Sequence, residues 1–388
     1  MTGETASFAA AVAAVPGLSA AVTAAADAAD DVDRKSRFPS EAIDLIKDAK
    51  LLSCSLPTAL GGRSAGITEL AVIARALGAG CSSTGMVFAM HHTQALAMAR
   101  HACEGPTATL TAEIASSEAL LASATTEITT GGDVRSSTCA VVSDGDHIVL
   151  EKNAPVISYA EYADYICATA RRGPDSAPDD QVLVVCPAAD TTLEMTRPWD
   201  VLGFRGTCSP GYILTVRTAA SHVVPVDYSR ISESTMLPTS HTLWASVWLG
   251  IADAALNKAR KATRDAVREG GTSTSPQAAK LADLTVAHQS LEAIVGREVS
   301  RYQKFLNSSE TEPTVGFTIA MNNLKLASST AIVEVVAAAL LLIGINGYRE
   351  NHPLSMGRLL RDSFAPQLMV SNDRIRANNA QLVLMHRT

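Results

Sequence analysis

The feature that most constrains the fold is a β-rich segment, residues 121–164, in the middle of a chain whose other parts have helical periodicity. Two runs with β-type composition, 137–142 and 147–150, flank an Asp-Gly turn sequence at 143–146. This arrangement predicts a β-hairpin. A loop rich in threonine and glycine, 124–133, precedes it. Because these side chains are small, the loop backbone can approach a flat polar ligand closely.

Short β-type runs continue to about residue 216 and are separated by glycine, proline and aspartate clusters, at 165–170, 182–186 and 212–216. This pattern favours a small β-barrel or sandwich over a parallel sheet with crossover helices. Helical periodicity dominates before and after these runs, with long apolar-faced stretches at 244–266, 277–305 and 318–343. We therefore expect a mainly α, α+β protein with a helical domain at 1–117, a β domain at 118–231 and a helical domain at 232–388.

Composition excludes several classes of protein. The 388 residues are 47% hydrophobic and 18% charged, which indicates a globular chain long enough for more than one domain. The net charge of -7 and the lack of a basic block argue against nucleic acid as a partner. The apolar run at 331–343, broken by Glu334, is shorter than the ~20 residues of a membrane span. We therefore expect no membrane insertion.

The cysteines and the N-terminus point to a cytoplasmic protein. The seven cysteines form no CxxC pair, and their number is odd, so we expect reduced thiols buried as small hydrophobic groups. The N-terminal residues are rich in alanine but lack the basic start of a signal peptide. His91 and His92 are adjacent, and adjacent residues point to different faces of a helix. We interpret them as pocket or core histidines, not as metal ligands.

The middle segment resembles the flavin-binding domain of the acyl-CoA dehydrogenase family. The family loop Thr-Glu-Pro-Gly-Ala-Gly-Ser-Asp has the length of 126–133 here, where Thr126, Glu127, Gly132 and Asp133 keep its key residues beside Gly131. A second family motif is matched by Ile157-Ser158 followed at the expected distance by Ala163-Asp164.

Motifs along the rest of the chain occur in the family's order. They are a Pro-x-x-x-Gly-Gly loop at 57–62, a Ser-Ser-Thr helix start at 82–84, a Gly-x-Arg-Gly-Thr segment at 203–207 and a domain exit at 223–225. The resemblance thus covers nearly the whole chain. It implies an N-terminal helical domain, a middle β-barrel or sandwich domain and a C-terminal four-helix-bundle domain.

The resemblance also implies a cofactor and a reaction. Family members bind FAD between the β domain and the C-terminal bundle, and they dehydrogenate an acyl thioester carried by CoA or by a carrier protein. A glutamate removes the α-proton, and hydride passes from the β-carbon to flavin N5. The family forms homo-oligomers, usually homotetramers, so we expect a dimer or tetramer. The identity of the electron acceptor does not follow from the resemblance.

Residues at matching positions are the expected cofactor contacts. Thr126, Glu127, Gly131 and Gly132 form the loop beside the isoalloxazine ring, and Ile157 with Ser158 lies near N5. Arg264 takes the place of the family's cofactor-binding arginine, although Val267 replaces the aromatic residue expected after it. Asn346 and Gly347 lie where the family places the adenosine half of FAD on a neighbouring subunit.

The catalytic glutamate is missing from both of its usual places. Val370 stands at one, eight residues after Asp362, and Thr330 stands at the other, eighteen residues before Tyr348. Glu334 lies one turn from Thr330 in an apolar helix, where a carboxylate should be paired or have a raised pKa. Glu334, or Asp373 near the C-terminus, is therefore the candidate base, and Lys325 is a candidate ion-pair partner of Glu334.

The missing base keeps three functions open. The first and favoured one is α,β-dehydrogenation of an acyl thioester with a displaced base. The second is a monooxygenase using reduced flavin on the same fold, of the dibenzothiophene monooxygenase or nitrososynthase type, which needs no α-proton base. The third is a catalytically silent flavin-binding homologue. A carboxylate beside a deep apolar channel favours the first, and a roomier pocket without a carboxylate favours the second.

Overall fold

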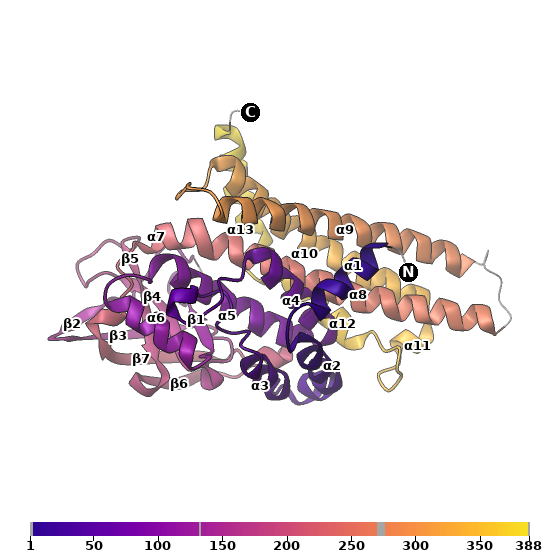
Figure 1. Ribbon diagram of the computed structural model, residues 1–388, viewed down its shortest axis with the longest axis horizontal. Helices are drawn as coiled ribbons and strands as arrows, with labels where there is room; N and C mark the ends of the chain where they lie inside the picture. The colour runs from indigo at the N-terminus through magenta and orange to yellow at the C-terminus, as the bar shows by residue number, and fades with distance from the viewer. Residues whose placement is uncertain (1–2, 132, 270–275, 387–388) are drawn as a thin grey trace.

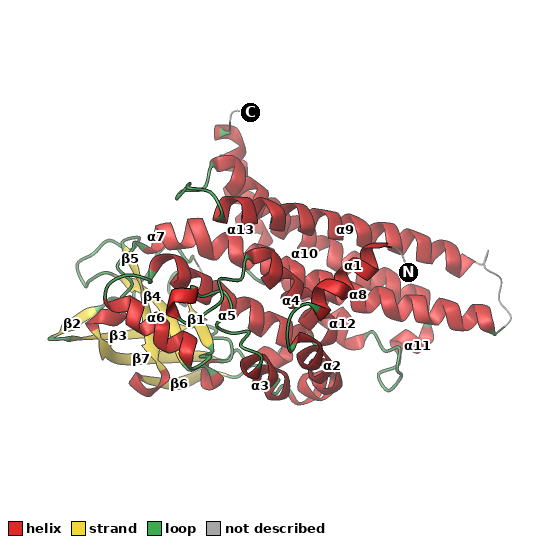
Figure 2. Ribbon diagram, in the orientation of Figure 1, coloured by secondary structure: helices red, strands yellow, loops and turns green. Residues whose placement is uncertain are grey.

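Residues 3–131, 133–269 and 276–386 are described by a computed structural model, shown in Figures 1 and 2. The chain forms an N-terminal group of helices, a β-region and a group of long C-terminal helices (Figure 1). The N-terminal helices are α1 (Gly3–Ala13), α2 (Leu18–Lys35), α3 (Ser40–Asp48), α4 (Ile67–Gly80), α5 (Ser82–His101) and α6 (Pro106–Ser116). This order confirms the predicted mainly α, α+β fold.

Two sheets make up the β-region. One has three strands in the order β1-β4-β5, and the other has four in the order β2-β3-β7-β6. The strands are β1 (Leu121–Ala124), β2 (Val142–Asp144), β3 (His147–Ala154), β4 (Tyr165–Arg171), β5 (Gln181–Pro187), β6 (Thr191–Arg197) and β7 (Gly211–Ala219). The antiparallel β2–β3 pair, in which Asp144 lies opposite His147, confirms a hairpin at this place, but its first strand is Val142–Asp144 and not the predicted 137–142. β1 and β6 were not predicted.

The C-terminal group begins with α7 (Tyr228–Ile231), which leads through the π-helical turn Ser232–Met236 into the long α8 (Leu237–Arg268). It continues with α9 (Pro276–Leu306), α10 (Val315–Ile343), α11 (Ile345–Tyr348), α12 (Gly357–Leu368) and α13 (Asn372–Met385). Gly78 of α4 and Gly250 of α8 lie where a Cβ atom would collide with the backbone of the other helix. This close approach of α4 to α8 joins the N-terminal helices to the C-terminal group.

α10 differs from the prediction in two ways. Its second half, which its apolar composition predicts to be buried in a bundle, leaves one face uncovered, where Leu341 is 76% exposed. Its apolar stretch is also longer than the predicted run, so that by length and composition α10 alone could cross a membrane; α2 with part of α1 passes the same test only as a pair bent by 102°. Within the described residues, α10 packs against α8, α9 and α12, as a core helix does.

α3 begins at Ser40, and Pro39 in front of it offers no side-chain cap. All seven cysteines are free thiols, and five of them are buried. The expectation of buried, unpaired thiols is therefore confirmed for most of them.

Candidate active site

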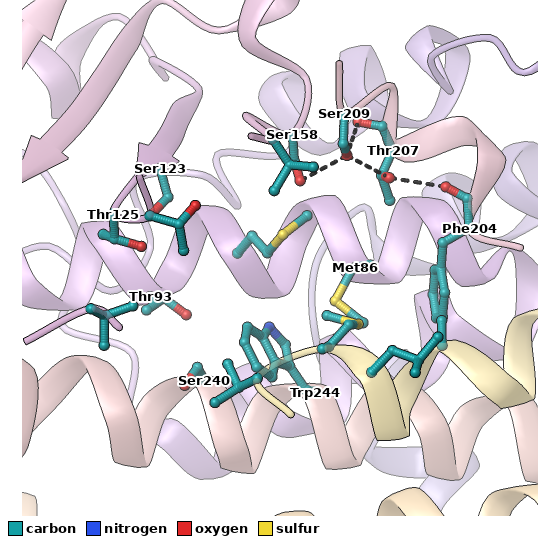
Figure 3. Close-up of a pocket in the computed structure, with 18 of the residues that line it drawn as sticks. Met86, Thr93, Ser123, Thr125, Ser158, Phe204, Thr207, Ser209, Ser240 and Trp244 are labelled. Atoms are coloured by element: carbon teal, nitrogen blue, oxygen red, sulfur yellow. Dashed lines mark hydrogen bonds between the residues drawn. The ribbon is translucent and has the colours of Figure 1, made fainter. Parts of the chain in front are cut away.

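A cavity of about 610 Å³ lies between α5, α8, α12 and one edge of the β-region (Figure 3). Sulfur-containing and aromatic side chains make up much of its wall: Met86, Met90, Met236, Met369, Trp199, Trp244, Phe204 and Phe364. A wall of this kind excludes water and accepts a flat apolar molecule. A volume of this size falls in the range of small-molecule and cofactor sites.

Hydroxyl groups line the side of the cavity formed by the β-region. Ser123 and Thr125 alternate along the end of β1, and Thr126 follows them. Ser158, in the loop after β3, completes this hydroxyl wall, as Figure 3 shows. The sequence prediction identified Thr126 and Ser158 but not Ser123 or Thr125, although their alternate spacing beside a strand was a usable signal.

Ser158 is oriented by a short chain of hydroxyl groups. Ser209 Oγ donates to Ser158 Oγ at 2.9 Å, and Thr207 Oγ1 donates to the Phe204 carbonyl oxygen at 2.9 Å (Figure 3). Ser158 Oγ also lines the cavity, where a hydroxyl group can exchange a hydrogen bond with a ligand. Oxidised flavin presents acceptor atoms along one edge of its ring, so this hydroxyl fits that group.

Glu127 makes its hydrogen bonds inside the protein. It is buried, its Oε1 accepts from Lys152 Nζ at 2.8 Å, and its Oε2 accepts from the Thr138 backbone N–H at 2.8 Å. Burial raises the pKa of Glu127, but the Lys152 ammonium and the neighbouring hydroxyls lower it further, to about 2. Glu127 is not among the residues that line the cavity, and its cofactor contact stays a prediction. Glu127 fixes the loop that presents Thr125 and Thr126.

The other residues of the two predicted cofactor motifs have different positions. Gly131 has φ +59° and an open space where a Cβ would lie. Its carbonyl accepts from Arg374 of α13. Gly132 lies outside the described residues. Ile157 is fully buried, and its N–H donates to the Pro210 carbonyl at 2.9 Å, so it holds Ser158 in place without lining the cavity.

Three predicted cofactor residues lie far from the cavity in this chain. Arg264 is exposed on α8 twenty residues after Trp244, which is roughly 30 Å along the helix at about 1.5 Å per residue. Asn346 and Gly347 belong to α11, at the opposite end of the molecule from the β-region (Figure 1). One chain therefore does not bring these residues to the hydroxyl wall, and a shared cofactor would require a second copy.

Neither candidate base lies at the cavity. Glu334 is on the exposed face of α10, and Asp373 has a 91% exposed side chain that pairs with Arg376 at 2.9 Å. The reasoning from burial was wrong for Glu334, because the apolar helix exposes that face. Lys325 was expected near Glu334, but its Nζ donates to the Val370 carbonyl and to Asn372 Oδ1, each at 2.7 Å.

Val370 does line the cavity, at the position where the resemblance expected a glutamate. Its φ is +45°, which is unusual for a β-branched residue. The buried Lys325 holds this backbone, and burial lowers the pKa of Lys325 to about 8. Lys325 of α10 thus holds the turn between α12 and α13 in place. No sequence signal pointed to Lys325 in this role.

The ionisable groups in the cavity wall are neutral or paired at neutral pH. Burial lowers the pKa of His241 to about 3 and raises the pKa of Tyr228 to about 12. Arg361 pairs with Asp33 and, at 3.7 Å, with Glu350. Among the described residues that line the cavity, none carries a carboxylate.

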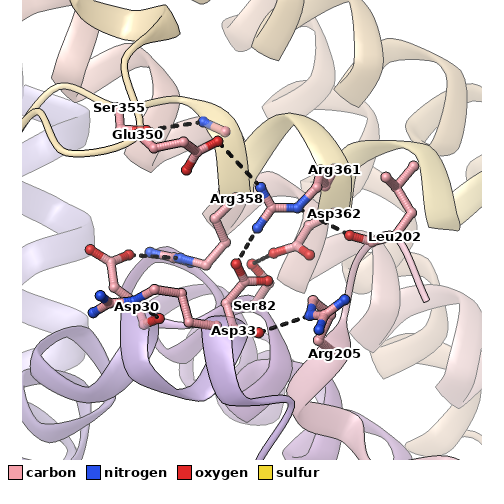
Figure 4. Close-up of polar contacts among 12 residues, drawn as sticks. Asp30, Asp33, Ser82, Leu202, Arg205, Glu350, Ser355, Arg358, Arg361 and Asp362 are labelled. Atoms are coloured by element: carbon pink, nitrogen blue, oxygen red, sulfur yellow. Dashed lines mark hydrogen bonds and ion pairs between the residues drawn. The ribbon is translucent and has the colours of Figure 1, made fainter. Parts of the chain in front are cut away.

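Figure 4 shows how the loop of the cavity wall is anchored to α12. Asp362 accepts from the Phe204 N–H and from Ser82 Oγ, each at 2.6 Å. Arg361 Nε donates to the Leu202 carbonyl at 3.1 Å. Arg205 Nε reaches the Asp33 carbonyl at 2.8 Å. The Arg361-Asp362 pair therefore ties three elements together: the loop at 199–207, α2 and α5.

His91 and His92 are core residues, as predicted. Both are fully buried. His91 Nε2 donates to the Leu52 carbonyl at 2.8 Å, and its Nδ1 accepts from the Leu121 N–H at 3.0 Å. His92 bonds Leu51 and Ser55 in the same way. Across the described residues, no group of three or more His, Cys, Asp or Glu side chains is placed to hold a metal ion.

Comparison with known proteins identifies relatives over most of the chain. Residues 19–118 match the family description "Acyl-CoA dehydrogenase, N-terminal domain", and residues 233–370 match "Acyl-CoA dehydrogenase, C-terminal domain". Cyclohex-1-ene-1-carbonyl-CoA dehydrogenase of Geobacter metallireducens is 24% identical over 352 residues, covering 89% of this chain and 90% of that protein. The probable acyl-CoA dehydrogenase FadE25 of Mycobacterium tuberculosis is 22% identical over 352 residues, or 89% of this chain and 88% of that one.

Solved structures share the whole fold. FMN-bound TdsC from Paenibacillus sp. A11-2, a dibenzothiophene monooxygenase, superposes with a TM-score of 0.83 at 17% identity, covering 96% of this chain and 98% of that one. A nitrososynthase from Micromonospora carbonacea var. africana gives a TM-score of 0.79 at 20% identity, covering 95% of this chain and 96% of that one. At such identities the likeness establishes the fold alone.

Proposed function

Because this chain belongs to the acyl-CoA dehydrogenase family of flavoprotein oxidoreductases, we propose that it binds a flavin in the cavity and inserts one oxygen atom of O2 into a small substrate. The observation that carries the proposal is the cavity wall, in which the described residues provide no carboxylate and Val370 stands in place of the base. Without a base of suitable pKa, the α-proton of a thioester has no acceptor.

The hydroxyl wall supports flavin as the cofactor. Thr125, Thr126 and Ser158 offer hydroxyl donors on one side of a largely apolar space. Ser209 holds the Ser158 hydroxyl in position through a hydrogen bond of 2.9 Å. These residues would hold the isoalloxazine ring. FAD remains our expectation from the family, and FMN is the cofactor named for TdsC.

When bound and reduced, a flavin supplies two electrons, which together with two from the substrate reduce O2 so that one oxygen enters the substrate and the other leaves as water. The chain itself provides a largely apolar wall, in which the Arg361 guanidinium is paired with Asp33. Met86, Phe204 and Trp244 exclude water around the reacting atoms, which limits wasteful release of peroxide. Ser158 would hold the edge of the ring through a hydrogen bond.

Dehydrogenation of an acyl thioester is the second candidate, and it is favoured by the names of the sequence relatives. Its base would have to be His241, whose Nδ1 donates to the Met321 carbonyl at 3.2 Å and leaves Nε2 as an acceptor. A pKa of about 3 makes that imidazole a weak base. The lack of a carboxylate among the described residues of the cavity wall therefore favours oxygenation.

The test compares two reactions of the same purified protein. In air, reduced FMN or FAD is delivered by a separate reductase with indole as the probe, and mass spectrometry follows incorporation from isotopically labelled O2. Without oxygen, the protein with oxidised flavin is mixed with a panel of acyl-CoA thioesters, and flavin absorbance is recorded. We expect labelled product in the first reaction and no bleaching in the second. Bleaching by a thioester would replace the proposal with dehydrogenation.

A titration of FMN and of FAD into the flavin-free protein precedes both reactions, because a chain that binds neither would be a silent homologue.

We also propose that the protein works in the cytoplasm as a homo-oligomer. The free thiols support the location. The exposed apolar side chains at the end of α10 and on α11 support the assembly.

A further inference from the structure

Gln94 brings an unsatisfied polar atom to the cavity wall. It lies on α5, lines the cavity and has only 1% of its surface exposed. Its Nε2 donates to Ser123 Oγ at 2.8 Å, whereas its Oε1 finds no hydrogen-bond partner among the described residues. Buried polar groups are nearly always paired, so an unpaired acceptor that lines a cavity indicates a ligand donor.

Trp244 offers the complementary group. Its Nε1 is buried and has no partner among the described residues, and its ring lines the cavity. In Figure 3 the indole lies across the cavity from Ser158, with its nitrogen on the edge nearer that serine. Trp248, one turn later on α8, also has an unpaired Nε1, but it is fully buried and does not line the cavity.

The charge of the wall restricts the ligand further. Arg361 is already paired with Asp33 and Glu350, and His241 and Tyr228 are neutral near pH 7. A charged ligand group would lose its hydration without gaining a counter-ion. A neutral molecule with few polar groups avoids that cost.

We propose that the cavity selects a small, neutral and largely apolar molecule that carries one N–H or O–H donor and one carbonyl-type acceptor. Gln94 Oε1 accepts from the donor, and Trp244 Nε1 donates to the acceptor. The two residues thus determine specificity. This inference rests on the proposed function only in taking the cavity as the substrate site.

Binding is measured by calorimetry with oxidised FMN in excess and again without flavin, so that no turnover occurs and oxygenation is not needed for the result. Four probes of similar shape are compared: oxindole, N-methyl-oxindole, indole and indene. Oxindole has both the N–H donor and the carbonyl acceptor. N-methyl-oxindole lacks the donor, indole lacks the acceptor, and indene lacks both. We expect oxindole to bind about tenfold or more tightly than either single-group probe.

Two variants assign the preference to the two residues. Gln94→Met should remove the preference for oxindole over its N-methyl form, and Trp244→Phe should remove the preference for oxindole over indole. The matched controls are Gln181→Met and Trp248→Phe, which alter buried side chains that also have one polar atom without a partner among the described residues but do not line the cavity. Both controls should keep the wild-type order of affinities.

Three results would overturn the proposal. One is equal affinity for all four probes. Another is a preference that Gln94→Met and Trp244→Phe leave unchanged. The third is a failure of oxindole to bind up to its solubility limit. If the four probes bind in the expected order of affinity but no oxygenated product forms, only the proposed function is contradicted.

Discussion

The buried carboxylate of Glu127 holds the loop that presents the hydroxyl wall. Its side chain is 3% exposed and reaches Lys152, Ser137 and Thr138. Because the folded-state pKa is about 2 and the ordinary value is 4.5, the ionised carboxylate stabilises the fold. That stabilisation is fully present above about pH 4.5 and is lost as the pH falls towards 2.

Glu127→Gln should lower the free energy of unfolding at pH 7 by roughly 2–3 kcal/mol, because Lys152 would be left buried without its counter-ion. It should also flatten the dependence of the melting temperature on pH between 5 and 3. Thermal unfolding across that range measures both effects. The control is Glu151→Gln, an exposed neighbour on β3. An unchanged pH dependence in Glu127→Gln would show that the ion pair does not stabilise the fold.

Single residues show where the sequence was informative. Thr126 and Ser158, which the spacing of the family loop and motif predicted as cofactor contacts, do line the cavity, and the contact itself stays a prediction. Glu334 was misjudged because an apolar sequence does not reveal which face of a helix is covered. Gln94, Ser123 and Trp244 were missed because each comes from a different element, and only the packing of α5, β1 and α8 brings them to one cavity.

At the scale of elements, α12 holds the cavity wall through Asp362. This buried carboxylate accepts hydrogen bonds from the Phe204 backbone and from Ser82 on α5. Two hydrogen-bond donors therefore depend on one side chain. From the sequence, Asp362 served only to locate Val370, and its anchoring role was not predicted. The helices themselves were predicted well, because their apolar periodicity is long and regular.

Asp362→Ala should lower the free energy of unfolding by roughly 2–4 kcal/mol, because it leaves the Phe204 N–H and the Ser82 hydroxyl unpaired. Denaturant unfolding at neutral pH measures this change. Asp373→Ala, an exposed aspartate of α13, is the control and should change stability by less than about 0.5 kcal/mol. A loss of similar size in both variants would contradict the anchoring role.

The missed strands have a physical explanation. β1 is only four residues long, too short for the alternation of Ser123 and Thr125 with alanines to mark a strand. β6 is mostly exposed and lies at the edge of its sheet, where few apolar residues mark it. β1 forms because it pairs with β4, and β6 because it pairs with β7. Pairing with a strand that is distant in the sequence leaves no signal in the short segment itself.

At the scale of the whole molecule, an apolar surface remains uncovered at the end of the C-terminal helices. Leu341, Ile345 and Tyr348 are 76%, 64% and 76% exposed. They adjoin Asn346 and Gly347, which were predicted to contact a cofactor of a neighbouring subunit. Exposed apolar residues grouped in this way favour a contact with another copy of the chain.

Leu341→Asp should therefore shift the protein to a smaller assembly, because a charge buried in a subunit contact without a partner is costly. Light scattering after size-exclusion chromatography gives the mass. Val286→Asp changes an apolar residue of α9 that is 64% exposed, and it should leave the mass unchanged. The assembly would have to use another surface if both variants kept the wild-type mass.

The length of α8 has a consequence for how the protein would respond to dilution. The helix carries Trp244 at the cavity and Arg264 roughly 30 Å away along its axis. The cavity and Arg264 of the same subunit therefore lie too far apart to contact one FAD molecule. If a second copy holds the adenosine end, cofactor loading and subunit association become a single linked equilibrium. Diluting the protein would then release FAD as subunits separate, whereas FMN, which lacks the adenosine half, would be retained.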